Sequence, residues 1–360
     1  MNKIPLIENA CKDLLQYGVF DAKARAKYLI KRYLLRRRVA GEDLIFWPTG
    51  LLAAGLWHCR QELLEKEDDV GRTIGMIDQA LTSYYERWLQ KGMPLAFLDD
   101  LLAGETLLRI YEKMNKGTSA FGGKLSGERV KAALDKMAAF ALEHPKDAAG
   151  SFFYRPANGE KTVFVDGIGL AVPFLYQYGE VFEKQEYQEL ALKQITNFLA
   201  YGMDGETGLP YHGYDLSDGG CKYGVIGWGR AVGWLLRGMT GCMTSDYGRR
   251  QLEAPCRALV EAVVPYRRID GFSWQLQALE GPADTSATAI ICAAIMRGMA
   301  CGGLSGEACE KTVAVGREVL AHFTKDGRIW HGLAECEGFS CYPQRYGAYP
   351  WSLGPALEVL

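Results

Sequence analysis

The segment GIGLAVPFLYQYG, residues 167–179, contains none of Asp, Glu, Lys or Arg. A helix without a polar face has to be covered on all sides, so this segment is predicted to be a helix buried inside the protein. Its Gly and Ala residues lower helix propensity, which suggests close packing against neighbouring backbones. Four further segments are equally free of charge: residues 48–58, 231–236, 285–296 and 349–357. A fifth segment, residues 99–111, mixes apolar with charged residues.

A second kind of helical segment alternates with the first along the chain. In residues 126–143, for example, Val130, Leu134 and Met137 recur at helical spacing while charged residues point elsewhere. This amphipathic pattern is typical of helices at the surface of a protein. The predicted outer helices are residues 21–38, 70–91, 126–143, 183–200, 247–266 and 305–322.

The starts of the buried segments are regularly spaced, at intervals of 52 to 67 residues. Such a period indicates a repeated helical hairpin, even though the repeats share negligible sequence identity. The simplest closed arrangement is a ring of inner helices inside a ring of outer helices. We therefore predict an all-α fold, an (α/α)6 barrel of six helical hairpins, forming one domain over residues 1–360. The six starts are marked by Trp47, Asp99, Asp166, Trp228, Asp284 and Tyr349.

Loop lengths predict where a site lies. Connections from an inner to the next outer helix are short, whereas those from an outer to the next inner helix are long. Long ordered loops are usually functional, and here they all fall above the N-termini of the inner helices. They are rich in aromatic residues, whose faces suit sugar rings, although the same rings could simply pack the loops down. The long loops are residues 144–165, 201–227, 267–283 and 323–348.

Composition and charge argue against several classes of protein. The 41 Lys and Arg against 43 Asp and Glu give a net charge of −2, which argues against a nucleic-acid binder, and the basic residues 36–38 are interpreted as a solvated helix face. No apolar run could span a membrane, and residues 1–20 lack the apolar core of a signal peptide, so we expect a cytoplasmic protein. Ten cysteines without a C-x-x-C pair and five scattered histidines predict reduced thiols and no metal site.

Several polar residues at the starts of the buried helices allow two interpretations each. Asp166 is either a helix N-cap or a general acid whose pKa is raised at the mouth of an apolar barrel. Asp99 and Asp284 have the same ambiguity, and Asp100 is interpreted as a cap or a surface partner of Asp99. Arg230 is the lone charge of its helix start and needs a carboxylate, either from a structural Asp or from a substrate.

Three other residues are equally ambiguous from local sequence alone. Trp228 and Trp234, six residues apart, share roughly one helix face and either fill the core or line a site. His212, in a long loop, either binds a ligand or supports a turn.

Together these residues resemble glycoside hydrolase family 105, the unsaturated rhamnogalacturonyl hydrolases, with family 88 as the nearest related family. The similarity runs from the Trp47-Pro48-Thr49-Gly50 segment to the final helix. The most specific match is Trp228-x-Arg230-x-x-Gly233-Trp234. The other matches are Leu98-Asp99 with Gly104, Val165-Asp166 followed by Pro173-Phe174-Leu175, Tyr211-His212-Gly213-Tyr214-Asp215 and Asp284-Thr285-Ser286-Ala287-Thr288-Ala289.

The resemblance implies a six-hairpin glycosidase that removes the unsaturated uronic acid left by polysaccharide lyases at the non-reducing end of pectic oligosaccharides. Such enzymes hydrate the C4=C5 double bond, with Asp166 protonating C4 and helping water to add at C5. Asp99 lies nearby in this scheme, Arg230 and His212 hold the uronate carboxylate and a hydroxyl, and no metal or organic cofactor is involved. Trp47, Trp228, Trp234 and Asp284 complete the implied substrate site.

Two alternatives remain at this point. An inverting glycosidase acting on saturated sugars would use Asp99 and Asp166 as base and acid, with the carboxyl groups about 6.5–9.5 Å apart. An inactive barrel that only binds sugars is favoured by one departure from the family pattern, because Ala231-Val232 stands where the family commonly has Gly-Asn. That departure puts the identity of the oligosaccharide in doubt but does not affect the acid.

Overall fold

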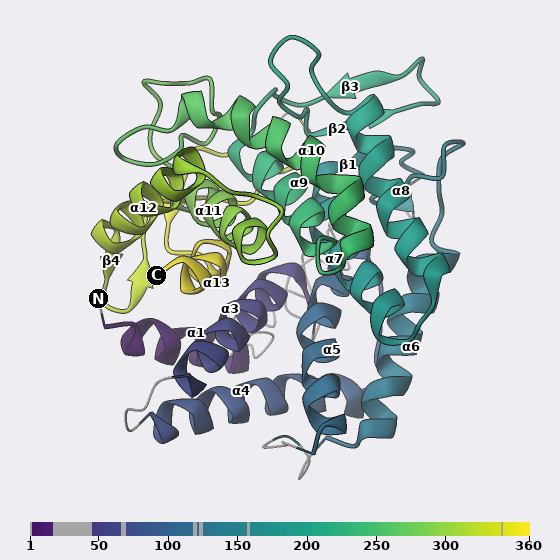
Figure 1. Ribbon diagram of the computed structural model, residues 1–360, viewed down its shortest axis with the longest axis vertical. Coiled ribbons are helices and arrows are strands. Elements are labelled where there is room, and N and C mark those ends of the chain that lie inside the picture. Colours follow the sequence, from purple (N-terminus) through teal and green to yellow (C-terminus); the bar gives the residue numbers. More distant parts are fainter. Residues whose placement is uncertain are drawn as a thin grey trace, which may run out of the picture.

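The computed structural model describes residues 2–16, 45–65, 70–117, 121, 125–156, 159–339 and 341–360. The outer helix predicted at residues 21–38 and the basic residues 36–38 lie outside these ranges. Figure 1 shows a helical molecule in which short strands occur only within the connecting loops.

Six inner helices form a closed ring in the described structure. Each packs against the next, and the last packs against the first, as the predicted (α/α)6 barrel requires. The predicted starts lie within one residue of the observed ones, except that the 3-10 helix η2 (Leu98–Leu101) precedes α5. The inner helices are α3 (Trp47–Leu64), α5 (Leu102–Asn115), α7 (Val165–Val181), α9 (Gly229–Gly241), α11 (Thr285–Ala300) and α13 (Pro350–Val359).

The outer helices surround this ring, with α12 on the left, α10 toward the top, α8 and α6 on the right and α4 at the bottom of Figure 1. Each buries one apolar face against the inner ring, as the amphipathic pattern predicts. Helix α1 (Ile4–Gln16) was not foreseen and packs against α3, α4 and α13. The others are α4 (Gly71–Gln90), α6 (Gly127–Glu143), α8 (Gln185–Tyr201), α10 (Asp246–Val263), continued by the 3-10 helix η4 (Val264–Tyr266), and α12 (Glu307–His322).

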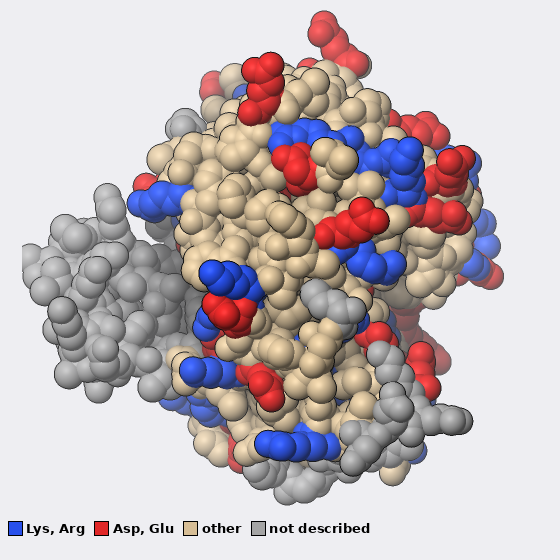
Figure 2. All heavy atoms as spheres, turned by 90° about the vertical axis from the view of Figure 1, so that its left-hand side faces the viewer, with Lys and Arg blue, Asp and Glu red and all other residues tan. Residues whose placement is uncertain are grey.

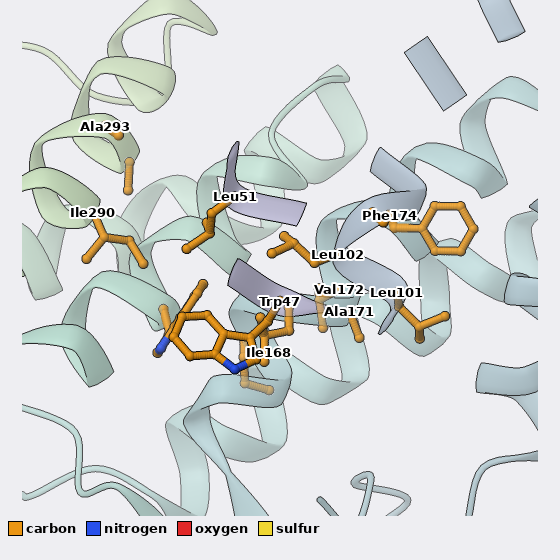
Figure 3. Close-up of a cluster of buried hydrophobic side chains, with 14 of the residues drawn as sticks. Trp47, Leu51, Leu101, Leu102, Ile168, Ala171, Val172, Phe174, Ile290 and Ala293 are labelled. Carbon is orange, nitrogen blue, oxygen red and sulfur yellow. The ribbon is translucent and has the colours of Figure 1, made fainter. Parts of the chain in front are cut away.

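The interior of the barrel is filled by side chains of the inner helices. Figure 3 shows Trp47 and Leu51 of α3 meeting Ile168 of α7 and Ile290 of α11 in one apolar cluster. Close approach of α9 and α11 requires a glycine, because a Cβ atom at Gly233 would lie 2.1 Å from Cγ2 of Ile290. The glycine of the most specific sequence motif therefore serves helix packing.

A buried ion network connects four of the inner helices. The charge-free segments predicted from the sequence end one residue before Arg237, Arg297 and Glu358. Both arginines pair with Glu105 of α5, and Glu358 pairs with Arg297. Arg297 donates to Glu105 and Glu358 at 2.8 Å each, and Arg237 pairs with Glu105. Burial alone would raise the pKa of Glu105, but the charges of Arg237, Arg297 and Arg109 lower it to about 2. The network was not expected from the sequence.

Three small antiparallel sheets organise the long loops. Strands β1 (Val163–Phe164), β2 (Gly213–Asp215) and β3 (Cys221–Tyr223) form one sheet in that order, with Phe164 opposite Gly213. This sheet joins the loop before α7 to the loop before α9. The other two pairs lie between α12 and α13 and consist of β4 (Thr324–Lys325) with β5 (Arg328–Ile329) and β6 (Gly332–Leu333) with β7 (Tyr346–Gly347).

The surface carries both signs of charge. On the face seen in Figure 2, Lys and Arg side chains are interspersed with Asp and Glu, in line with the net charge of −2. Within the described ranges, no helix combines the length and the apolar character that a membrane crossing needs.

Candidate active site

A pocket of about 220 Å³ opens at the end of the barrel where the long loops meet. Its inner wall is formed by first-turn or flanking residues of α3, α7 and α9, and its mouth by the loops that precede α7 and α13. The wall is mostly aromatic, and the mouth carries charged side chains. The lining residues are Trp47, Tyr154, Arg155, Glu160, Phe164, Asp166, Leu170, Trp228, Arg230, Trp234, Glu335, Cys336, Glu337 and Gly338.

Asp166 lies on the pocket wall in the first turn of α7. The N-cap of this helix is Phe164, so the interpretation of Asp166 as a helix cap is wrong. Instead, its Oδ2 atom lies 3.0 Å from Nε2 of His212. The residue is 9% exposed, which leaves the carboxyl group accessible to a ligand in the pocket while most of it is shielded from water.

His212 lies behind Asp166 and is completely buried. Its backbone carbonyl accepts a hydrogen bond from Val165 N, and its backbone N–H donates to Tyr223 O, so the β1–β2–β3 sheet determines its position. Its Nδ1 atom lies 2.9 Å from the hydroxyl of Tyr342. Both ring nitrogens are thus occupied within the protein, and His212 contacts Asp166 without forming part of the pocket wall.

Arg230 is held in the first turn of α9 by neutral acceptors. Nη1 donates to Ser286 Oγ at 3.0 Å and to Leu333 O at 2.9 Å, and Nη2 donates to Ala334 O at 2.8 Å. The carboxylate of Asp284 is 3.9 Å from Nη1. Among the described residues, Nε–H has no acceptor and Nη2 makes one hydrogen bond with its two N–H groups, so the Nε–Nη2 edge of the guanidinium group keeps unused donors. Such an edge matches a carboxylate in bidentate geometry.

The three tryptophans of the predicted site contribute to one wall. The Trp47 ring lies 6.1 Å from the Trp234 ring, and the guanidinium carbon of Arg230 lies 4.9 Å from the centre of the Trp228 ring. Trp228 is 1% exposed, and its indole nitrogen has no hydrogen-bond partner in the part of the chain that the structure describes. A buried donor without an acceptor is costly, so this N–H group is a candidate contact for a ligand.

The structure places Asp284 and Asp99 outside the pocket wall. Asp284 is the N-cap of α11, where its Oδ1 accepts from Ser286 N at 2.9 Å and from Leu333 N at 2.9 Å. Asp99 is 2% exposed in η2. Burial and the charges of Asp99 and Asp166 raise the pKa of Tyr154 well above its usual value, and a hydrogen bond to Asp99 adds to this effect. Asp99 therefore contacts Tyr154, a residue of the pocket wall, without lining the pocket itself.

Asp100, the neighbour of Asp99, has a local structural role. Its Oδ2 atom accepts hydrogen bonds from Ala96 N at 2.8 Å and from Phe97 N at 3.0 Å, as expected for a residue that caps the start of η2.

Sequence reasoning missed most of the pocket mouth. Arg155 and Glu160 lie in the loop before α7, and residues 335–338 lie in the loop before α13; neither segment contains a motif that would single it out. Tyr154 and Tyr342 were noticed only as members of an aromatic set, because nothing in the local sequence indicates their polar contacts. In the described residues, no group of three or more His, Cys, Asp or Glu side chains could hold a metal ion.

An aromatic pocket above the inner helices of an (α/α)6 barrel, with a carboxyl group and an arginine in its wall, is the arrangement of a glycoside hydrolase. The chain belongs to Glycosyl Hydrolase Family 88, whose model matches residues 25–344. This confirms the resemblance inferred from the motifs.

Individual relatives agree with this assignment. An unsaturated rhamnogalacturonyl hydrolase, YesR of Bacillus subtilis, is 23% identical over 326 residues, which are 87% of this chain and 88% of the relative. The crystal structure of a possible family 105 member from Klebsiella pneumoniae has a TM-score of 0.79 at 17% identity, covering 98% of this chain and 90% of that one. The unsaturated glucuronyl hydrolase of Streptococcus agalactiae has a TM-score of 0.63 at 12% identity, covering 100% and 91%.

Proposed function

We propose that this protein releases an unsaturated uronic acid from the non-reducing end of a lyase-generated oligosaccharide by hydrating its C4=C5 double bond. The observation that carries the proposal is that the Asp166 carboxyl group and the open edge of Arg230 line the same pocket. The names of the relatives point to the same substrate class, since they include unsaturated rhamnogalacturonyl and glucuronyl hydrolases.

Substrate binding follows from the unused donors of the pocket. The Nε–H and Nη2–H groups of Arg230 take the uronate carboxylate, and the aromatic wall of Trp47, Trp228 and Trp234 covers the apolar face of the ring. The indole N–H of Trp228 donates to a sugar hydroxyl or to the carboxylate. In this scheme Asp284 has an indirect role, because it caps α11 and holds Ser286, a hydrogen-bond partner of Arg230.

The chemistry begins with proton transfer from the Asp166 carboxyl group to C4. The positive charge that develops at C5 is shared with the ring oxygen, and a water molecule adds at C5 while the Asp166 carboxylate accepts one of its protons. The resulting hemiketal opens to a ketone at C5, which leaves a hemiacetal at C1. Collapse of this hemiacetal to an aldehyde releases the second sugar, and the acid is regenerated.

Asp99 is assigned a supporting role in this mechanism. Its contact with Tyr154 holds a phenol on the pocket wall beside Asp166. An inverting mechanism would instead need two carboxyl groups on the pocket wall with water between them. Asp99 does not line the pocket, so this arrangement is not favoured for the pair of Asp99 and Asp166.

We also propose the biological setting of the reaction. The whole chain, residues 1–360, acts as one catalytic domain on fragments of rhamnogalacturonan or a related pectic polysaccharide. A cytoplasmic location is supported by the ten cysteines, none of which is paired in a disulfide, because unpaired cysteines are typical of a reducing compartment.

The test uses unsaturated disaccharides prepared with polysaccharide lyases. The purified protein is expected to remove their near-ultraviolet absorbance as the double bond is consumed, and to leave a matched saturated disaccharide intact. Hydrolysis of the saturated sugar would favour the inverting glycosidase. Binding of both sugars without turnover would favour an inactive sugar-binding barrel.

A further inference from the structure

A tyrosine from the last long loop stands behind the candidate acid. Its hydroxyl, Tyr342 Oη, lies 2.9 Å from His212 Nδ1, and His212 Nε2 lies 3.0 Å from Asp166 Oδ2. The three side chains come from three separate segments of the chain and form one continuous line of hydrogen bonds. His212 in the middle is fully buried, so solvent does not compete for either ring nitrogen.

We propose that Tyr342 is a positioning residue that holds His212 in the tautomer with its proton on Nε2. The inference rests on the proposed role of Asp166 as the acid of the reaction. A neutral histidine carries a single N–H group, so the partner of one ring nitrogen determines what the other nitrogen can do.

The hydrogen bonds around Tyr342 indicate the direction of the proton chain. Val225 N donates to Tyr342 Oη at 3.4 Å, so this oxygen already accepts one hydrogen bond. In the described structure, His212 Nδ1 is the acceptor within reach of the tyrosine hydroxyl hydrogen. When the tyrosine hydroxyl donates to Nδ1, this nitrogen is the acceptor and carries no proton. The proton of the neutral ring then lies on Nε2, where it points at Asp166 Oδ2.

This tautomer determines which oxygen of Asp166 carries the catalytic proton. Because His212 donates to Oδ2, that oxygen is an acceptor, and the acid proton is placed on Oδ1, the oxygen left for the pocket. In the opposite tautomer the proton of the carboxyl group would point at Nε2, away from the substrate. Tyr342 thus acts on the reaction through His212, without touching the sugar.

Three neighbouring groups, the side chains of Tyr342, Cys336 and Tyr154, stay protonated while Asp166 transfers its proton. Burial raises the pKa of Tyr342 above its usual range and the pKa of the Cys336 thiol to about 12. The charge of Asp166 adds to both effects. Tyr154, with Asp99 behind it, is likewise kept as a phenol, because burial and the two carboxylates raise its pKa. The other charges that face these groups are the guanidinium groups of Arg230 and Arg155 and the carboxylate of Glu335.

The backbone at Gly224 leaves room for the contact between Tyr342 and His212. Gly224 has a φ of +82°, and a Cβ atom there would lie 2.5 Å from His212 Cβ and 2.7 Å from Tyr342 Oη. A residue with a side chain at this position would push the tyrosine hydroxyl away from the histidine. The Trp228 and Trp274 rings, each 5.5 Å from the Tyr342 ring, hold the phenol from the other sides.

The first test observes the tautomer directly and needs no substrate. The ¹⁵N chemical shifts of the histidine rings are measured in the full-length protein, with His212 assigned by its loss in His212→Gln. We expect a protonated Nε2 and an unprotonated Nδ1 in the wild type, and a mixture of forms in Tyr342→Phe. A protonated Nδ1 in the wild type would overturn the inference, whatever the activity of the protein.

The second test measures kcat, KM and the pH profile of Tyr342→Phe on an unsaturated disaccharide. We expect kcat to fall about 10- to 100-fold with KM within about twofold, as for a small misplacement of a catalytic group. The shape of the pH profile should differ from that of the wild type, because the tyrosine hydroxyl no longer directs the proton between His212 and Asp166. A uniform loss at every pH would indicate a purely structural role and overturn the inference.

A matched control comes from the same loop. Tyr346→Phe also removes one hydroxyl, but that hydroxyl contacts Gln344 at 3.0 Å and not the histidine. Its pH profile and the ¹⁵N shifts of His212 should match those of the wild type. If neither the wild type nor any variant acts on the disaccharide, the proposed function fails, while the tautomer measurement still decides the structural inference.

Discussion

Oδ2 of Asp166 and Nε2 of His212 are 3.0 Å apart although 46 residues separate them in the chain. The contact depends on the pairing of β1 with β2, which places His212, directly before β2, beside the start of α7 that carries Asp166. Asp166 thereby has one oxygen engaged by the protein and the other available to the pocket. This asymmetry is what the proposed proton transfer requires, and it can be tested by changing the carboxyl group alone.

Replacing Asp166 by Asn should lower kcat on an unsaturated disaccharide by about 10²- to 10⁴-fold, the usual contribution of a general acid. The amide has nearly the same shape, so binding of the disaccharide should persist when measured by calorimetry. Asp284→Asn is an unsuitable control because it alters the α11 cap. Asp215→Asn is suitable because, among the described residues, this carboxylate at the end of β2 accepts hydrogen bonds from Ser217 alone. Full activity of Asp166→Asn would remove this residue from the mechanism.

Replacing Arg230 by Lys should raise KM and lower kcat/KM by about 10- to 100-fold, the value of one or two hydrogen bonds to a charged group. Lysine keeps the charge but cannot hold Ser286, Leu333 and Ala334 while also presenting a two-pronged edge to a carboxylate. A substrate analogue in which the uronate is reduced to the alcohol provides the comparison. Equal losses on the acid and the alcohol would mean that Arg230 does not bind the carboxylate.

Replacing Gly233 by Ala should lower the free energy of unfolding by about 1–3 kcal/mol, because the new methyl group overlaps Cγ2 of Ile290. Urea unfolding of the two single variants and of Gly233→Ala with Ile290→Ala measures the coupling between the positions. The alanine at 233 should cost less when Ile290 is already shortened. Additive losses would show that the two residues do not press against each other.

Replacing Glu105 by Gln should lower the free energy of unfolding at neutral pH by about 3–5 kcal/mol, because Arg237 and Arg297 lose a buried partner. The pKa of Glu105 is about 2 in the folded protein against an ordinary value of 4.5. Its contribution is therefore complete above about pH 4.5 and is lost as the pH falls toward 2.

The wild type should lose stability through that acidic window more steeply than the Glu105→Gln variant. Glu112→Gln, which breaks a half-exposed pair with Arg109, should change the free energy of unfolding by less than about 1 kcal/mol. Parallel stability curves for the wild type and the Glu105 variant would contradict the assigned role of the network.

The barrel could be predicted because most of its inner helices have no polar face, and a closed ring is the simplest arrangement that buries them on all sides. The helix starts followed from the same pattern, down to Trp47 and the residues around Asp284. Helix α1 starts 67 residues before α4, within the hairpin period, but it was not foreseen because the first outer helix was predicted at residues 21–38. The ion network was missed because Arg237, Arg297 and Glu358 lie just past the ends of the uncharged segments, where a count of local charge stops, and their partner Glu105 lies in the mixed segment.

The site was predictable only in part, for a related reason. Residues at the starts of inner helices, such as Asp166, Trp228 and Arg230, are brought together by the ring itself, so the fold prediction carries them into one pocket. The roles of His212 and Tyr342 depend on strand pairing and loop conformation across long sequence separations. Local sequence does not encode which atoms such loops bring into hydrogen-bond distance. Asp284 is the opposite case, because the observed helix N-cap is one of the two interpretations that its local sequence allowed.

The carbonyl groups of Leu333 and Ala334 that hold Arg230 belong to the same loop that carries Tyr342 and the acidic mouth residues. Part of the pocket mouth and the supports of Arg230 and His212 are thus built into one stretch of chain. An engineer who grafts this loop from a relative to obtain a new specificity would also exchange the supports of the arginine and the histidine. A grafted loop should therefore function only when the helix starts that it supports are replaced together with it.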